Sequence, residues 1–321
     1  MSGEAQPSAG CSTGQPLVSV IINCFNGMRY LREAIDSVYA QTYAAWEIIF
    51  WDNASTDESP AIAQSYDQRL RYFRGEQNVP LGAARNKAIE QAQGEYLCFL
   101  DCDDVWLPGK LERQIAAMER GQYTLGYAGV EEIDGSGQKI GQDVPDYPCG
   151  MLFEQLLFQF NINVPTAILK RARLLELGLN FDPTVTASEE YCLFMQLAVT
   201  EPILVMPEIL AKYRIHDGAL TAKSISKWAL EREYTLDRIR NRHPEVESRF
   251  PRAFREAYAR ARYYRARYLV EVGDRKGARS ELGKNLGLGW RYLLLFCLLF
   301  LPGVFWQAAH RLRSKRILAC S

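Results

Sequence analysis

Short apolar segments alternate with segments of helical periodicity over roughly the first 110 residues, and this alternation restricts the possible folds more than any other feature. Nearly continuous apolar runs occur at residues 17–22, 46–51 and 95–100, as in strands that are covered on both faces. Between the first two runs, the apolar residues of YLREAIDSVYAQ recur at helical spacing. Short connections between such elements favour a parallel sheet inside a three-layer α/β domain.

An acidic cluster follows the third apolar run, in the segment FLDCDDVWLP at residues 99–108. In an extended chain Asp101 and Asp103 point to the same side, and a divalent cation with oxygen ligands would neutralise them. Ligands of α/β sheets bind beyond the carboxyl ends of strands. The cluster therefore predicts metal-bound phosphate, with a solvated acidic turn as the alternative.

The net charge of zero conceals a strong asymmetry along the chain. Residues 1–220 contain 16 Lys+Arg and 29 Asp+Glu, whereas residues 221–321 contain 22 and 9, so the two parts carry −13 and +13. A basic part that also contains apolar residues fits an anionic membrane surface. Nucleic acid is the competing partner, but the chain has neither zinc-finger spacing nor an RNA-binding aromatic signature, so we expect none.

The cysteines and the N-terminus both indicate a cytoplasmic location. The eight cysteines include no CxxC pair, and several lie inside apolar runs, as expected in a reducing compartment. Residues 1–15 are polar and lack the basic start and apolar stretch of a signal peptide, so they are predicted to be a disordered lead-in.

The C-terminal third has a different character. Residues 226–272 are rich in Arg, Tyr, Ala and Glu at helical spacing, which predicts a helical extension over 223–290. Residues 292–306 are apolar, but this stretch is shorter than the roughly 20 residues that span a bilayer. Basic residues follow it, so we expect 291–321 to be an interfacial or re-entrant membrane segment at the inner face of the membrane, with a buried core helix as the alternative.

Three segments, in order and spacing, resemble the family 2 glycosyltransferases of the GT-A fold: PLVSVIINCFNG, AIDSVYAQTYAAWEIIFWDNASTD and NVPLGAARNKAIEQAQGEYLCFLDCDDVWLP. The resemblance covers roughly residues 16–220. It implies a Rossmann-like three-layer α/β/α domain over 16–222. It also implies an inverting hexosyltransferase that moves a sugar from a UDP or dTDP sugar to a hydroxyl of a glycan or lipid-linked acceptor, as in the assembly of bacterial surface polysaccharides.

The resemblance assigns the residues around the nucleotide. Asp52 matches the family aspartate that accepts a hydrogen bond from the base, although a helix cap is its alternative role. Asn53 and Ala54 stand where the family usually has a second Asp and a Gly. Asn23 and Phe25, in the turn after the first apolar run, would meet the base or ribose.

The resemblance also predicts a magnesium or manganese site. Asp103 matches the direct metal ligand of the family's DxD motif, and Asp101 shares the metal or contacts ribose, with Cys102 beside the nucleotide. Arg85 resembles the family arginine near the nucleotide, and Gly82 would allow the chain to approach closely. A surface arginine on a helix is the alternative for Arg85.

Further residues are assigned downstream, in TASEEYCLFMQLA and YRIHDGALT. Glu190 stands where the family has an aspartate as the catalytic base, and Glu189 could share that role. Acidic residues that complement a helix dipole are the alternative. His216 is placed near the metal and Arg214 near the diphosphate.

Two other functions compete with this interpretation. A nucleotidyltransferase would share the sheet, the nucleotide and the acidic metal site, but the chain lacks a Gly-rich loop with a basic residue after the first apolar run. A non-catalytic membrane scaffold that keeps the fold is favoured only by the departures at Asn53 and Glu190.

Overall fold

The computed structural model describes residues 14–216, 225–302 and 305–306. The predicted lead-in lies outside these residues apart from its last two positions. In the predicted membrane segment 291–321, most residues beyond 302 also lie outside the described ranges.

The strands and helices alternate in the first part of the chain, and among the described residues only helices follow residue 224. The strands are β1 (Val18–Cys24), β2 (Trp46–Asp52), β3 (Leu70–Arg74), β4 (Tyr96–Phe99), β5 (Val105–Trp106), β6 (Leu125–Asp134), β7 (Lys139–Asp143), β8 (Ile168–Lys170) and β9 (Ile203–Ile215). The helices before residue 217 are α1 (Met28–Tyr39), α2 (Ser59–Gln64), α3 (Leu81–Gln91), α4 (Lys110–Arg120), α5 (Phe153–Phe158), α6 (Arg171–Glu176) and α7 (Glu189–Ala198). The C-terminal helices are α8 (Ile225–Arg242), α9 (Val246–Arg249), α10 (Pro251–Glu271), α11 (Arg275–Gly283) and α12 (Trp290–Leu298).

Within the described residues, nine strands form one sheet in the order β3-β2-β1-β4-β8-β6-β9-β5, with β7 beside β6. The predicted parallel arrangement holds for β3, β2, β1 and β4. It is wrong for β8, which runs antiparallel to both β4 and β6, and for β5 and β7, whereas β6 and β9 are again parallel. The reason is that the chain enters β8 from a loop and a short 3₁₀ turn, Val164–Thr166, rather than from a crossover helix.

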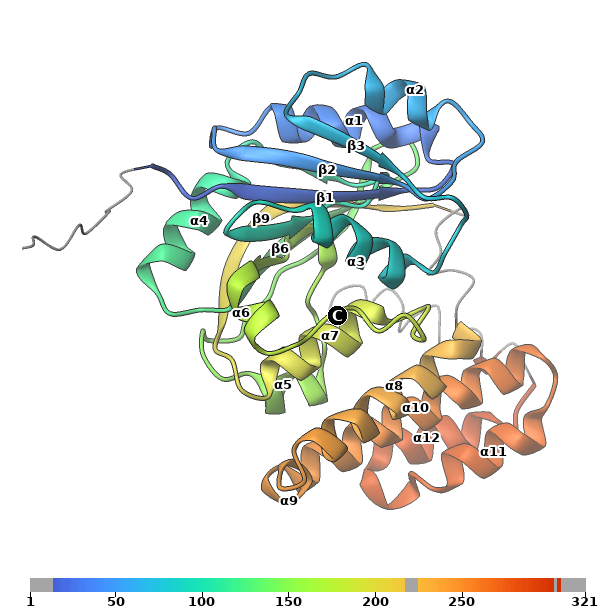
Figure 1. Cartoon of the computed structure of the whole chain (residues 1–321). Coiled ribbons are helices and arrows are strands. Elements are labelled where there is room, and N and C mark those ends of the chain that lie inside the picture. Colours follow the sequence, from blue (N-terminus) through green and yellow to red (C-terminus); the bar gives the residue numbers. More distant parts are fainter. Residues whose placement is uncertain (1–13, 217–224, 303–304, 307–321) are drawn as a thin grey trace, which may run out of the picture.

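The sheet is covered on both faces, as the apolar runs predicted. Successive residues of β1 alternate between two cores, since Val20 and Ile22 pack with Leu31 of α1, whereas Ile21 packs with Ala88 of α3. Helices α1 and α2 lie on one side of the sheet, and α3 and α7 lie on the other (Figure 1). The expected three-layer α/β/α arrangement is therefore confirmed.

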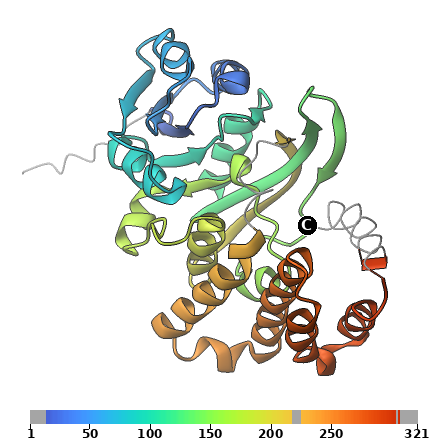
Figure 2. The same ribbon diagram turned by 90° about the vertical axis from the view of Figure 1, so that its right-hand side faces the viewer.

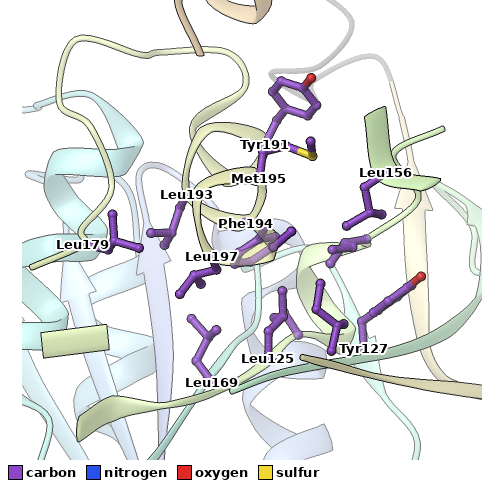
Figure 3. Close-up of a cluster of buried hydrophobic side chains, with 14 of the residues drawn as sticks. Leu125, Tyr127, Leu156, Leu169, Leu179, Tyr191, Leu193, Phe194, Met195 and Leu197 are labelled. Atoms are coloured by element: carbon purple, nitrogen blue, oxygen red, sulfur yellow. The ribbon is translucent and has the colours of Figure 1, made fainter. Parts of the chain in front are cut away.

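Helix α7 is almost entirely buried, which fixes the body of the helix. Phe194 and Leu197 point toward Leu125 of β6 and Leu169 of β8 (Figure 3). Nine of the ten α7 residues are buried. A helix packed in this way cannot slide as a whole.

The C-terminal helices gather beside α5 and α7 at one end of the molecule (Figure 1, Figure 2). Leu236 of α8 and Phe254 of α10 belong to the same core as α7. The second half of α10 forms a separate core with α11 and α12, to which Tyr263, Leu282 and Leu295 contribute. In the part of the chain that the structure covers, no helix has the length and apolarity needed to cross a bilayer.

Candidate active site

The carboxyl ends of β1, β2 and β4 open into a cleft of about 1180 Å³, which also receives the start of α7 and the end of β9. Every site residue predicted from the sequence lines this cleft except Asp52. Its size suits a nucleotide with an attached sugar, since cofactor pockets reach roughly 1,000 Å³.

The acidic cluster sits in a turn rather than in an extended chain. Strand β4 ends at Phe99, so the strand alternation that we used to align Asp101 and Asp103 does not apply. The two carboxylates nevertheless both line the cleft and have different partners. Asp101 Oδ1 lies 2.9 Å from Arg85 Nη2, and Asp103 Oδ2 lies 2.9 Å from His216 Nε2. Burial and the charge of Asp101 raise the pKa of Asp103, and His216 opposes this shift.

The third carboxylate of the cluster is structural. Asp104 is buried and accepts a hydrogen bond of 2.8 Å from the backbone N–H of Arg214. Burial, together with the neighbouring charges of Asp103 and Asp101, raises its pKa well above the ordinary value. This bond ties the acidic turn to the end of β9.

Arg85 is a buried link between two carboxylates, so the alternative of a surface arginine is wrong, and its place near the nucleotide stays a prediction. It is 2% exposed, and its Nη1 lies 3.0 Å from Glu189 Oε1 while Nη2 binds Asp101. The glycine at position 82 serves this packing, because a Cβ there would meet the Cβ atoms of Glu189 and Phe181 at 3.3 Å. The close approach made by Gly82 is thus to α7 and its preceding loop.

The two glutamates at the start of α7 differ sharply. Glu189 is buried and paired with Arg85. Its pKa is raised, because the effect of burial exceeds the opposing effect of that arginine. Glu190 lines the cleft, and its carboxylate makes no hydrogen bond to another residue within the described part of the chain. Burial first, and the neighbouring Glu189 second, raise the pKa of Glu190 to about 8. Of the two candidates for the base, Glu190 is the one that is not held in an ion pair.

Asp52 is not among the residues that line the cleft. Its carboxylate is fully buried and accepts hydrogen bonds from the Tyr72 hydroxyl at 2.7 Å and the Ser55 N–H at 2.8 Å, and it pairs with Arg74. Contact with a nucleotide base would require one of these donors to leave. The role of Asp52 in binding the nucleotide base stays a prediction.

The departures at Asn53 and Ala54 have a structural account. The side-chain amide of Asn53 donates to the carbonyl of Val79 at 2.8 Å and accepts from its N–H at 3.2 Å, so it fixes a loop at the cleft edge. Ala54 has a φ of 67°, in the left-handed region where glycine is favoured. The family glycine at this position fits the same backbone without strain.

The turn after β1 presents two groups suited to a nucleotide. Asn23 is 7% exposed, and neither its amide nitrogen nor its oxygen has a partner within the described residues. Phe25 is 48% exposed on the cleft. Cys102 instead turns toward Cys24, since both sulfurs lie within 3 Å of where a Cβ on Gly27 would stand. An unpaired buried amide is costly, so Asn23 favours a ligand.

Arg214 and His216 are anchored around Tyr30, which the sequence analysis did not single out. The guanidinium of Arg214 stacks over the Tyr30 ring at 4.3 Å and binds Glu33 at 2.6 Å and the Asp103 carbonyl at 2.8 Å. The Tyr30 and His216 rings lie 5.2 Å apart. Arg214 therefore supports the acidic turn directly, and binding of diphosphate by it stays a prediction.

The sequence analysis also missed Glu231, which lies in α8, far from the motifs. Its carboxylate binds the loop of residues 186–188 that leads into α7. No local signal marks this residue, because its partners are more than 40 positions away.

The donor atoms suit a hard cation that shares its coordination with substrate. Among the described residues, no three His, Cys, Asp or Glu side chains converge as a preformed metal site. Mg²⁺ and similar ions are often held by one or two carboxylates together with substrate phosphates. Asp103 and Asp101, both on the cleft, fit that kind of site.

Comparisons with known proteins identify the family of the chain. The sequence profile of "Glycosyl transferase family 2" matches residues 19–176. An uncharacterised glycosyltransferase of Rickettsia typhi is 32% identical over 67% of this chain and 69% of its own. A longer one from Rickettsia felis is 34% identical over 63% of this chain and 34% of its own. The Escherichia coli protein WfgD, named UDP-Glc:alpha-D-GlcNAc-diphosphoundecaprenol beta-1,3-glucosyltransferase, is 28% identical over 68% of this chain and 85% of its own.

Solved structures show the same fold at low identity. S. aureus TarS 1–349 in complex with UDP-GlcNAc has a TM-score of 0.57 and 18% identity, covering 85% of this chain and 93% of its own. The mannosyltransferase PcManGT from Pyrobaculum calidifontis, in complex with GDP-Man and Mn²⁺, has a TM-score of 0.53 and 17% identity, covering 89% and 85%. The chain is a glycosyltransferase with the GT-A fold, and it belongs to glycosyl transferase family 2.

Proposed function

We propose that this enzyme transfers a hexose from a UDP or dTDP sugar to a hydroxyl of a lipid-linked glycan by a single, inverting displacement. One observation carries the proposal: a single cleft contains both the Asp101–Asp103 turn and the unpaired carboxylate of Glu190. An acidic metal-binding group and a free base are the two elements that such a displacement needs.

On the donor side, Asp103 and Asp101 would hold magnesium or manganese against the diphosphate. The bound cation would stabilise the negative charge that develops on the leaving diphosphate. His216, 2.9 Å from Asp103, orients that carboxylate. Phe25 and Asn23 would bind the base or ribose by stacking and by amide hydrogen bonds.

On the acceptor side, Glu190 takes the proton from the attacking hydroxyl. Its pKa of about 8, raised by burial, lies close to the operating pH, which suits a general base. Arg85 neutralises the adjacent Glu189, so only one of the two glutamates is left to accept a proton.

The relatives support the choice of substrates. WfgD is named for UDP-Glc and a diphosphoundecaprenol-linked acceptor, and TarS 1–349 is in complex with UDP-GlcNAc. A uridine sugar and a lipid-linked glycan of surface polysaccharide assembly are therefore the donor and acceptor that we propose.

The division of labour along the chain is part of the proposal. Residues 16–222 would carry the chemistry, 223–290 would form a helical support, and 291–321 would attach the enzyme to the inner face of the membrane. Trp290, Leu293 and Leu294 of α12 share one helix face and are 71%, 51% and 51% exposed. Exposed apolar residues next to a basic sequence suit the interface of an anionic membrane.

Donor binding is tested by calorimetric titration of the protein with UDP-GlcNAc, UDP-Glc and dTDP-Glc, with and without Mn²⁺. We expect binding of a uridine or thymidine sugar that requires Mn²⁺ and is lost in Asp103→Asn. Donor binding that is the same with and without Mn²⁺ and is unchanged in Asp103→Asn would contradict the assignment of Asp103 as the metal ligand.

Membrane attachment is tested by flotation with vesicles of neutral and anionic lipids. Leu293→Ser with Leu294→Ser should weaken binding to anionic vesicles by about 30-fold or more, since each side chain would lose roughly 1 kcal/mol or more of burial. Leu230→Ser, at an exposed position of α8, is the matched control. Equal binding by all variants would place the attachment elsewhere.

A further inference from the structure

Glu231 of α8 binds the loop before α7 with both carboxylate oxygens. Oε1 accepts hydrogen bonds from the Thr186 N–H at 2.8 Å and the Thr186 hydroxyl at 3.1 Å. Oε2 accepts from the Ala187 N–H at 3.0 Å and the Ser188 hydroxyl at 2.9 Å. Four donors on one carboxylate hold the loop far more tightly than a single bond would.

Other residues of α8 contact the chain on both sides of this loop. The Tyr234 hydroxyl and Arg238 both bind Asp182 Oδ2, at 2.7 Å and 2.9 Å. The guanidinium of Arg232 stacks over the ring of Tyr191 at 4.2 Å. Helix α8 thus contacts the segment from Asp182 to Tyr191 at its start, its middle and its end.

The loop that Glu231 holds determines where Glu190 sits. Ser188 is the residue before the first turn of α7, and its hydroxyl donates to Glu231 instead of capping its own helix. Glu190 follows two positions later, and its carboxylate has no hydrogen bond to another residue in the described structure to hold it. Its place in the cleft therefore depends on the backbone immediately before it.

We propose that Glu231 is a positioning residue for the reaction, which places Glu190 by fixing the backbone of residues 186–188. This inference rests on the proposed role of Glu190 as the base. It makes the helical extension a part of the active site rather than an appendage. The hydrogen bonds from Glu231 to residues 186–188 are called the clamp below. A small displacement of a catalytic base can lower the rate by as much as about 100-fold, so loss of the clamp should lower kcat.

The clamp itself is tested without any assay of activity. Hydrogen–deuterium exchange of a peptic peptide that contains Thr186 and Ala187 should be about tenfold faster or more in Glu231→Ala than in the wild type. Glu233→Ala is the matched control, because Glu233 lies on the same helix and pairs with Arg265 at 2.6 Å instead of with the loop. Unchanged exchange in Glu231→Ala, or equal acceleration in the control, would overturn the clamp.

The consequence for catalysis is tested by steady-state kinetics with the donor identified by calorimetry. Glu231→Ala should lower kcat by about 10- to 100-fold while KM for the donor changes less than about twofold. Glu231→Gln keeps the shape and one of the two acceptor oxygens, so it should lose less turnover than Glu231→Ala, and Glu233→Ala should keep the turnover of the wild type. A wild-type kcat in Glu231→Ala, or an equal loss in Glu233→Ala, would overturn the inference.

The two experiments also separate this inference from the proposed function. If the wild type transfers no sugar to any acceptor while Glu231→Ala still accelerates exchange, the proposed function fails and the clamp stands. If the wild type is active and Glu231→Ala exchanges and turns over normally, the inference fails and the proposed function stands.

Discussion

Two sets of polar side chains meet in the cleft, and they differ in how far the protein satisfies them. The paired set consists of Asp101, Arg85 and Glu189, in which one buried guanidinium pairs with two carboxylates. The unpaired set consists of Asn23 and Glu190, whose side chains have no hydrogen bond to another residue within the described part of the chain. The paired set can hold the cleft in shape, and the unpaired set carries an energetic cost that a substrate would relieve.

This comparison separates residues that build the site from residues that act in it. A resemblance of motifs alone places Arg85, Glu189 and Glu190 together as functional residues. The geometry assigns the first two to one another, because a buried guanidinium with two carboxylates has little left to offer a ligand. Substitutions of Arg85 and Glu189 should therefore affect stability first, and those in the unpaired set should affect turnover or binding first.

The largest effect is expected from Glu190→Gln. Removing a general base costs about 10²- to 10⁴-fold in kcat, and the amide has nearly the same shape as the carboxylate. The thermal midpoint should not fall, because a carboxylate that burial disfavours is replaced by a neutral group. Steady-state kinetics and thermal unfolding of the same preparation measure both quantities.

The neighbouring Glu189→Gln sharpens this result. It removes one of the two ion pairs of Arg85, so it should lower the thermal midpoint and affect kcat less than Glu190→Gln does. A greater loss of kcat in Glu189→Gln would exchange the roles of the two glutamates.

The next largest effect is expected from Arg85→Met. It leaves Asp101 and Glu189 without their shared cation, and breaking a buried ion pair costs about 3–5 kcal/mol of unfolding free energy. Arg85→Lys keeps the charge but cannot reach both carboxylates in the same geometry, so its loss should be smaller. Urea unfolding followed by circular dichroism gives both values. Equal stability of Arg85→Met and the wild type would mean that these pairs do not support the cleft.

Titration of Glu190 should make stability fall and turnover rise as the pH increases. Its pKa in the fold is about 8, above the ordinary 4.5, so the native state binds a proton that the unfolded state has lost. The contribution of Glu190 to the free energy of unfolding is fully present below about pH 4.5, and it decreases as the pH rises toward about 8. Turnover should increase over the same interval, because the base acts when deprotonated.

Glu190→Gln provides the control for that pH dependence. Its unfolding free energy should fall less between pH 5 and pH 8 than that of the wild type, measured by urea titrations of the ligand-free protein at about five pH values in this range. Parallel curves for the two proteins would show that another group titrates in this interval.

The sequence predicted the parts of the molecule that depend on local patterns. The parallel strands β1, β2 and β4 follow from apolar runs, and the positions of Asp101 and Asp103 at the end of β4 follow from the motif. The alignment of these two carboxylates by strand alternation was wrong, since the strand stops two residues earlier. Local patterns do not reveal where a strand yields to a turn.

The features that the sequence could not reveal are pairings across long separations. Arg85 and Glu189 are 104 positions apart, and Glu231 is 45 positions from Thr186. Nothing in the local sequence distinguishes a glutamate that clamps a loop from one that faces solvent. The same limit applies to Asp52, whose burial beneath Arg74 depends on the register of β2 with β3.

The smallest effect tests the unpaired set at its other member. Asn23→Ala removes an amide that the fold leaves unsatisfied, so the unfolding free energy should change by less than about 0.5 kcal/mol. The Kd for UDP should rise about tenfold, which corresponds to one or two hydrogen bonds of about 1 kcal/mol each. Asn53→Ala is the matched control, because both ends of its amide already bind Val79 and its loss should destabilise the fold. If Asn23→Ala were the less stable of the two and still bound UDP normally, Asn23 would belong with the residues that build the cleft, and the division drawn between the two sets would fail at that position.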